Sequence, residues 1–152
     1  MEVLNKIKAL LSEYEIQYEL LQHEAVHTSA DAAKIRDTDI SMGAKALIFY
    51  ADGSNILLVV PGNERVNTKK FKKQLNVKDM YMLHPDEVHK ITGLKVGSIP
   101  PLGKILGLKS YFDISFKEKD KVAFNAGSLT HSIVMQASDL LKVENPRILE
   151  IT

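Results

Sequence analysis

The chain has 152 residues, of which 45% are hydrophobic and 26% are charged, so it can bury a core and does not have the composition of a disordered protein. Its 20 basic and 19 acidic residues give a net charge of +1, which excludes the strongly basic balance typical of dedicated duplex binders. The lack of cysteine excludes disulfides, zinc–thiolate sites and a cysteine nucleophile. We expect one domain over residues 1–152, located in the cytoplasm and without a membrane span.

The first third of the chain predicts a helix, a strand and a second helix. Apolar residues at helical spacing predict an amphipathic helix over residues 1–14, and alternation over 16–20 predicts a half-buried strand. Thr28 and Asp31 have the form of a capping box, which begins a helix that runs through Ile35.

A hairpin is predicted next. The apolar runs 46–50 and 56–60 flank Asp52-Gly53, a pair that tolerates positive φ and is typical of tight hairpin turns. Because both runs are almost continuously apolar, we expect these strands to be covered on both faces.

The rest of the chain alternates irregularly between helices and strands. Further helices are predicted after caps at Asn67, His84 and Ser138, and further strands over 80–83, 110–114, 122–125, 132–136 and 148–151. No βαβ periodicity appears. The pattern therefore predicts an α+β fold, with a mixed, mainly antiparallel sheet and surrounding helices.

The segment from Val96 to Gly103 is the first candidate for a functional site. Glycine permits close approach to the main chain, and proline removes a donor while fixing φ, so Gly97 and the pair Pro100-Pro101 predict a rigid loop that works through its backbone. Carbonyls beside Gly97 and Ser98 could then orient a water or a ribose hydroxyl. The alternative is a tight connection between a helix and a strand.

The segment from Asn125 to Ser132 is the second candidate. Gly127 and Ser128 could direct amide donors at a carbonyl or a developing oxyanion, and His131 is the histidine next to this turn. The alternative is ordinary turn chemistry between two strands, with a structural histidine.

Lysines carry the remaining signals. Lys45 stands at the start of a predicted strand, and spacing alone gives it no special role. Lys69, Lys70, Lys72 and Lys73 form a dense patch that is either a solvated helix face or a site for phosphates. No P-loop, nucleophile elbow, dinucleotide fingerprint or zinc spacing is present in the sequence.

Taken together with Gly43-Ala44-Lys45, the order of these segments resembles the YbaK and prolyl-tRNA-editing family of aminoacyl-tRNA deacylases. The resemblance implies hydrolysis of the ester between an amino acid and the tRNA 3′ adenosine, assisted by a hydroxyl of the tRNA and without a metal or organic cofactor. It implies a catalytic group of Lys45, Gly97 and His131. It implies substrate-binding roles for Ser98, Ile99, Pro100, Gly103, Asn125, Ala126, Gly127 and Ser128.

The same resemblance implies a freestanding protein that acts on mischarged tRNA(Pro) carrying alanine or cysteine, with a link to prolyl-tRNA synthetase. Two positions depart from the family's branches. Thr130-His131-Ser132 stands where the cysteine-specific branch tends to carry an acid, and Ala46 stands where some alanine-specific members have asparagine. Two alternatives stay open: a non-catalytic module that binds tRNA or a nucleotide, and a hydrolase of other small acyl esters.

Overall fold

The computed structural model describes residues 2–152. Its helices are α1 (Glu2–Glu13), α2 (Ser29–Arg36), α3 (Thr68–Leu75), α4 (Pro85–Thr92), α5 (Gly103–Leu106) and α6 (Ala137–Glu144), with two short 3-10 helices, η1 (Ile40–Met42) and η2 (Ile114–Glu118). Its strands are β1 (Tyr18–Gln22), β2 (Ala44–Ala51), β3 (Ser54–Pro61), β4 (Met80–Met82), β5 (Lys109–Asp113), β6 (Lys121–Asn125), β7 (His131–Gln136) and β8 (Arg147–Leu149). Helices and strands alternate irregularly along the chain, so the predicted α+β class is confirmed.

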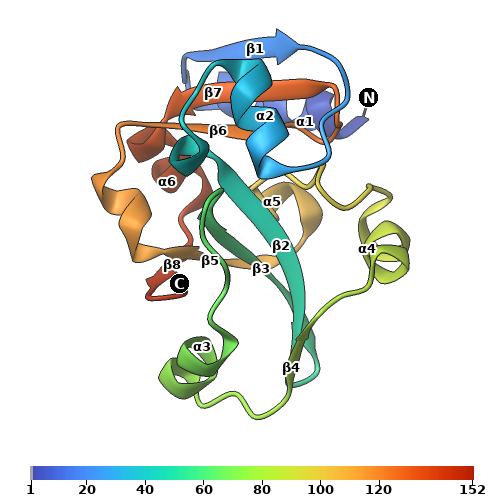
Figure 1. Cartoon of the computed structure of the whole chain (residues 1–152), viewed down its shortest axis with the longest axis vertical. Coiled ribbons are helices and arrows are strands. Elements are labelled where there is room, and N and C mark those ends of the chain that lie inside the picture. The colour runs from blue at the N-terminus through green and yellow to red at the C-terminus, as the bar shows by residue number, and fades with distance from the viewer. Residues whose placement is uncertain (1) are drawn as a thin grey trace.

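The strands form two sheets, where the sequence predicted one (Figure 1). A five-stranded sheet has the order β4-β2-β3-β5-β8, and β1-β7-β6 form a three-stranded sheet. The pairs β3–β5 and β5–β8 are parallel, and the other pairs are antiparallel. A parallel bridge between Gly43 and Ala123 connects the segment before β2 to β6. The two sheets therefore approach each other at two small residues.

The β2–β3 hairpin confirms its prediction. Asp52 and Gly53 both adopt positive φ, 44° and 92°, as a tight hairpin turn requires. Every residue from Ile56 to Pro61 on β3 is buried. This strand is covered on both faces because it lies in the middle of the five-stranded sheet, between two hydrophobic clusters.

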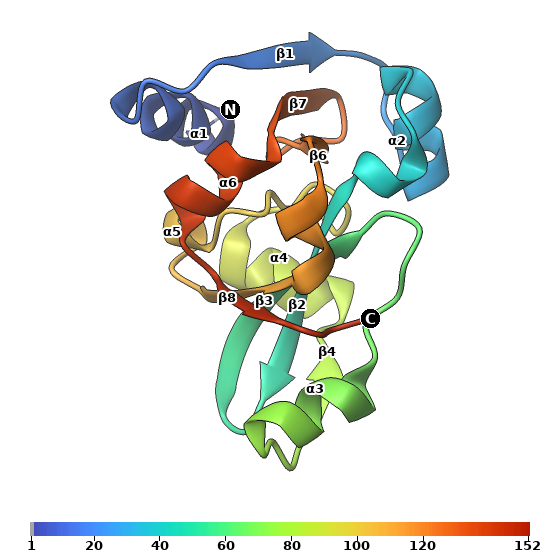
Figure 2. The ribbon, with the colours of Figure 1, turned by 90° about the vertical axis from the view of Figure 1, so that its left-hand side faces the viewer.

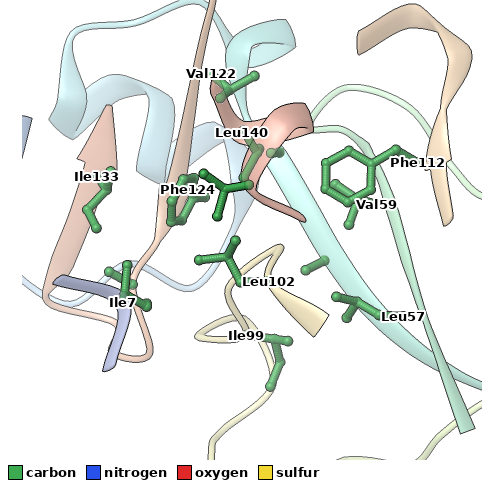
Figure 3. Packing of buried hydrophobic residues seen from close by; sticks show 14 of the residues in the cluster. Ile7, Leu57, Val59, Ile99, Leu102, Phe112, Val122, Phe124, Ile133 and Leu140 are labelled. Atoms are coloured by element: carbon green, nitrogen blue, oxygen red, sulfur yellow. The ribbon is translucent and has the colours of Figure 1, made fainter. Parts of the chain in front are cut away.

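The larger cluster fills the space between the two sheets and their helices (Figure 3). Phe112 from β5, Phe124 from β6 and Leu140 from α6 are at most 1% exposed. Ile99 and Leu102, which flank the double proline, also point into this cluster. Complete burial of a leucine side chain stabilises a fold by about 1.5–3 kcal/mol. The proline loop, residues 96–103, is therefore held in place by side chains that are buried in the core.

The smaller cluster covers the other face of the five-stranded sheet. Phe71 of α3 is fully buried, and its ring packs edge-on against Tyr111 of β5 with centroids 5.2 Å apart. The Asn67 side chain accepts a hydrogen bond from the Lys70 amide and so caps α3, as predicted. Figure 2 places α3 at the end of the molecule opposite α2, so the two helices lie near different ends of the β2–β3 hairpin.

One local prediction was wrong, and one short helix was missed. Helix α6 begins at Ala137 with Gln136 at its N-cap, so Ser138 lies inside the helix and does not cap it. Helix α5 was not predicted, because four residues carry too little periodicity to recognise. Its first amide, on Gly103, donates to the Glu144 carboxylate at 2.8 Å, so a residue distant in the sequence supplies the cap.

Candidate functional site

A cavity of about 290 Å³ lies where the two sheets approach each other. One face of α2, the start of β2, the glycine at position 62, the loop around Gly97 and the end of β6 line it. Both bridge residues, Gly43 and Ala123, are part of its wall. Of the residues that the resemblance assigned to a site, this cavity brings together Lys45, Gly97, Ile99 and Asn125.

The floor of the cavity consists of small residues. Ala44, Ala46 and Ala123 are each at most 8% exposed and come from the two neighbouring strands. Gly62 lies so close to the main chain that an added Cβ would stand 2.6 Å from the Ile40 carbonyl oxygen. Larger side chains at the alanine positions would reduce the space, and a side chain at Gly62 would collide with the main chain at Ile40.

Lys45 lies on β2 at the edge of this floor. Its Nζ donates to the Glu64 carbonyl oxygen at 2.6 Å. Burial is the main cause that lowers the pKa of Lys45, the charge of Arg65 adds to it, and Glu64 opposes it. An ammonium has three N–H donors, and the described residues give it this one partner, so two donors can serve a ligand.

The Gly97 loop is tied to the Asn125 segment. Gly97 adopts φ +91°, which favours glycine, and its carbonyl oxygen accepts from Asn125 Nδ2 at 2.6 Å. The next carbonyl, on Ser98, accepts from the Gly127 amide at 3.0 Å. The sequence separated these segments into two walls of one site, and the structure places them in direct contact.

These contacts also use groups that the sequence reasoning had left free for a ligand. The Gly127 amide is not available as an oxyanion donor, because Ser98 accepts its hydrogen. The Ser98 hydroxyl donates to the Lys95 carbonyl at 2.7 Å, and the Ser128 hydroxyl bonds to that of Thr130 at 2.9 Å. Ser98, Gly127 and Ser128 all lie outside the lining of the cavity.

The other assigned residues also lie outside the cavity. His131 begins β7, and its Nδ1 lies 3.1 Å from the Thr130 hydroxyl. Ala126 and Pro100 are buried. A Cβ on Gly103 would stand 2.2 Å from the Leu108 carbonyl oxygen, so packing explains this glycine. Roles for these residues in the reaction stay predictions that depend on the resemblance.

Arg36, at the end of α2, is a cavity residue that the sequence analysis missed. Its Nη2 donates to Asn125 Oδ1 at 2.8 Å, and its Nε donates to Ser132 Oγ at 2.9 Å. Burial lowers the pKa of Arg36 to about 10. Ser29, Ala32 and Arg36 follow one another at helical spacing, which places them on one face of α2 and was the signal available in the sequence.

The first turn of α2 supplies two hydroxyls at the cavity. The Thr28 hydroxyl oxygen accepts from the Asp31 amide, so its own hydrogen can be donated to a ligand. Ser29 lines the same wall. The Asp31 side chain makes no bond back to the Thr28 amide among the described contacts, so one half of the predicted capping box is confirmed.

The charged side chains that line the cavity are all positive. Arg36 and Lys45 line it, and no Asp or Glu is among its described lining residues. Cationic N–H donors form their strongest hydrogen bonds with electron-rich oxygens. The site therefore suits phosphate, carboxylate or an ester oxygen that gains negative charge during a reaction.

Comparisons with known proteins agree with this geometry. The family model described as "Aminoacyl-tRNA editing domain" matches residues 23–143, which include every residue of the cavity wall. The chain belongs to this editing-domain family. Its membership confirms the family that Gly43-Ala44-Lys45, the proline loop and the Asn125 segment indicated.

Relatives of this editing domain include both a separate protein and part of a larger enzyme. The Multifunctional Ser/Thr-tRNA deacylase ProXp-y of Escherichia coli (strain K12) is 28% identical over 148 residues, which cover 94% of this chain and 89% of that protein. A proline–tRNA ligase of Solidesulfovibrio magneticus is 34% identical over 88 residues, which cover 57% of this chain and 15% of the ligase. The crystal structure of hypothetical protein APE2540 has the same fold, with a TM-score of 0.87, 22% identity, and coverage of 96% of this chain and 98% of that one.

Two further features of the editing domain bear on its partners. The lysine patch over 69–73 lies on α3, which Figure 1 draws at the end of the molecule opposite α2, so it is not part of the cavity. Within residues 2–152, no helix is long and apolar enough to cross a membrane. The same residues contain no group of three His, Asp or Glu side chains arranged to hold a metal ion.

Proposed function

We propose that this protein is a deacylase that acts in trans on mischarged tRNA and hydrolyses the ester between the amino acid and the 3′ ribose. The observation that carries the proposal is the cavity of an editing domain, which combines two cations with a fixed glycine loop and has no acid among its described lining residues. The E. coli relative, which matches over most of its length, is named as a tRNA deacylase and supports the same reaction class.

In this reaction, a water oxygen bonds to the acyl carbon, and the bond from that carbon to the ribose oxygen breaks. The ribose oxygen takes up the proton that the water loses. Lys45 provides positive charge where the acyl oxygen becomes negative in the transition state. The tRNA's own neighbouring hydroxyl orients the attacking water, which agrees with a cavity whose described lining has no carboxylate base.

The substrate's amino acid is small. A floor of alanines and glycines in a cavity of about 290 Å³, which must also admit the ribose, leaves little space for a large aliphatic or aromatic side chain. Alanine and cysteine on tRNA(Pro) stay predictions from the family resemblance. The hydroxyls of Thr28 and Ser29, together with the name of the E. coli relative, add serine and threonine to the proposal. A buried substrate hydroxyl needs a hydrogen-bond partner, and these groups can provide one.

Partners follow from the same reasoning. The acylated 3′ end of tRNA is the proposed ligand, in the cytoplasm where charged tRNA is used. The similarity to a segment of a proline–tRNA ligase supports a link to prolyl-tRNA synthetase, which would release some of the mischarged tRNA that this protein clears.

Single-turnover deacylation over a panel of seryl-, threonyl-, alanyl-, cysteinyl- and leucyl-tRNA tests the proposal. We expect hydrolysis of one or more of the four small amino acids and at least tenfold slower hydrolysis of the leucyl ester. Binding of uncharged tRNA without hydrolysis of any ester would instead support a non-catalytic binding module. Equal hydrolysis of simple acyl esters that lack tRNA would support a general esterase.

A further inference from the structure

Arg36 is a partly buried cation whose described partners are both neutral. Its guanidinium bonds to the side chains of Asn125 and Ser132, and within residues 2–152 no carboxylate oxygen lies within 4.0 Å of it. A buried charge without an opposite charge is unfavourable for stability. A neutral donor could join α2 to the β6–β7 hairpin without this cost, so a role in stability alone does not explain the arginine.

The contacts of Arg36 fix the orientation of the Asn125 side chain. Oδ1 accepts from Arg36 Nη2 at 2.8 Å and lies 3.3 Å from Ser132 Oγ. Nδ2 then faces the Gly97 carbonyl oxygen at 2.6 Å. In the opposite orientation, the amide NH₂ would face the guanidinium and two acceptors would face each other at Gly97. The cation therefore determines which end of the amide reaches the loop.

Ser132, the other partner of Arg36, is held by a hydrogen bond to His23. His23 Nδ1 lies 2.7 Å from the Glu24 carbonyl oxygen, which can only accept, so this nitrogen carries the hydrogen. In the neutral ring, His23 Nε2 then accepts from the Ser132 hydroxyl at 2.7 Å. This leaves the Ser132 oxygen to accept from Arg36 Nε at 2.9 Å. The guanidinium is consequently held through two of its three nitrogens, Nε and Nη2, and cannot rotate away from Asn125 without losing both bonds.

Gly97 is the end of this chain of contacts that lines the cavity. It has φ +91° and is exposed, and its neighbour Val96 is 46% exposed. Nearby, the contact on the side where a Cβ would project is Leu129, at 3.5 Å. The Ser98 amide of the same peptide unit donates to the Lys95 carbonyl at 3.0 Å, and Asn125 is the side chain that donates to the Gly97 carbonyl oxygen. Asn125 therefore contributes to the direction of this carbonyl.

We propose that Arg36 is a positioning residue for deacylation, which acts through the Asn125 amide to hold the Gly97 carbonyl and its loop in the orientation that receives the aminoacyl ester. The inference rests on the proposed function for its effect on rate. Its structural part, the dependence of Gly97 on Arg36, can be measured without any activity.

We call the action of Arg36 on Gly97 through Asn125 a relay. The substitution Asn125→Asp distinguishes this relay from bonds that only stabilise the fold. Aspartate keeps the oxygen that faces Arg36 and adds an ion pair, so the melting temperature should stay the same or rise. It replaces the donor to Gly97 with a second acceptor, which repels the carbonyl. We expect kcat to fall about 10- to 100-fold, as small misplacements of reacting groups do, while the Kd for uncharged tRNA changes less than twofold. Wild-type kcat in Asn125→Asp would overturn the proposal.

Arg36→Lys tests the cation itself, because an ammonium keeps the charge but lacks the planar fork that bonds two partners at once. Its kcat should fall about tenfold, and the double variant with Asn125→Asp should be no slower than Asn125→Asp alone. Independent, multiplying losses in the double variant would show that Arg36 acts directly on the substrate and would overturn the relay. Arg147→Lys on β8 is the matched control, since this exposed arginine is outside the cavity.

The amide NMR shifts of Gly97 and Ser98 provide the readout that does not require turnover. In Arg36→Lys they should move, although two hydrogen bonds separate Arg36 from Gly97. Unchanged shifts would overturn the relay even if the enzyme is active. If the wild type hydrolyses no aminoacyl-tRNA but the Gly97 and Ser98 signals still move in Arg36→Lys, the proposed function is refuted. The coupling between Arg36 and Gly97 is established all the same.

Discussion

Replacing Lys45 with methionine removes the ammonium and keeps an unbranched side chain that can cover the same surface. In the free protein, the lost interaction is the 2.6 Å bond to the Glu64 carbonyl. Burial opposes the charge at this position, as the lowered pKa of Lys45 shows, so the loss of the bond is partly offset. We therefore expect the free energy of unfolding to change by less than about 1 kcal/mol, within the range of an ordinary hydrogen bond.

The effect on the reaction should be larger. A hydrogen bond to a charged group contributes about 1.5–3 kcal/mol. If Lys45 makes that bond in the transition state, its loss corresponds to a reduction in rate of roughly 10- to 150-fold, at 1.36 kcal/mol for each factor of ten. Lys45→Arg should recover little of this, because a planar fork does not replace a compact ammonium.

Single-turnover deacylation of seryl- and alanyl-tRNA, combined with thermal melting of each variant, measures both effects. Lys69→Met on α3 is the matched control, because this exposed lysine lies outside the cavity. Wild-type rates in Lys45→Met would refute the assignment of Lys45 to the reaction. A large loss of stability would instead show that the contact with Glu64 has a structural role.

Four further predictions follow from the same geometry. Gly103→Ala should lower the free energy of unfolding by about 1–3 kcal/mol or more in denaturant titrations, because the new Cβ would stand 2.2 Å from the Leu108 carbonyl oxygen; a wild-type midpoint would contradict this packing. Gly97→Ala should cost about 1–2 kcal/mol through its positive φ and should reduce kcat by more than that loss of stability explains; equal kcat would remove the loop from the mechanism. His131→Ala should slow deacylation less than Lys45→Met does, since His131 lies outside the cavity, and an equal loss would restore it to the reaction. Because the pKa of Lys45 is lowered on folding, the wild type should gain stability relative to Lys45→Met as the pH rises from neutrality toward 10.5, which melting curves at each pH would show; the opposite trend would contradict the burial of this charge.

The parts of the fold that local chemistry determines could be predicted from the sequence. Asp52-Gly53 could be recognised because positive φ at both positions suits few residues. Thr28 and Asn67 are helix caps because a side-chain oxygen accepts a free amide within the same turn. The α5 helix could not be found in this way, because Glu144, which caps it, lies far away in the chain.

Some residues of the candidate site could likewise be predicted from the sequence, and others could not. Gly97 and Asn125 could be proposed because glycines flank the double proline and Asn125 precedes the turn at Gly127, and both residues line the cavity. Arg36 could not be assigned, because its role depends on how α2 lies against β6 and β7. The Gly127 amide appeared available until the fold placed the Ser98 carbonyl against it. Which backbone groups are free to bind a ligand is a property of tertiary contacts, and sequence patterns do not report it.

Hydrolysis of the aminoacyl-tRNA ester in this cavity is the reaction that we propose. The most direct measurement is the rate of release of labelled amino acid from seryl-, threonyl-, alanyl- and cysteinyl-tRNA, in parallel with the wild type, Lys45→Met and no protein. We expect the wild type to hydrolyse at least one of these esters well above the spontaneous rate, and Lys45→Met to be roughly 10- to 150-fold slower, as expected for the loss of one charge-assisted hydrogen bond. Release at the spontaneous rate for all four esters with the wild type would contradict the claim.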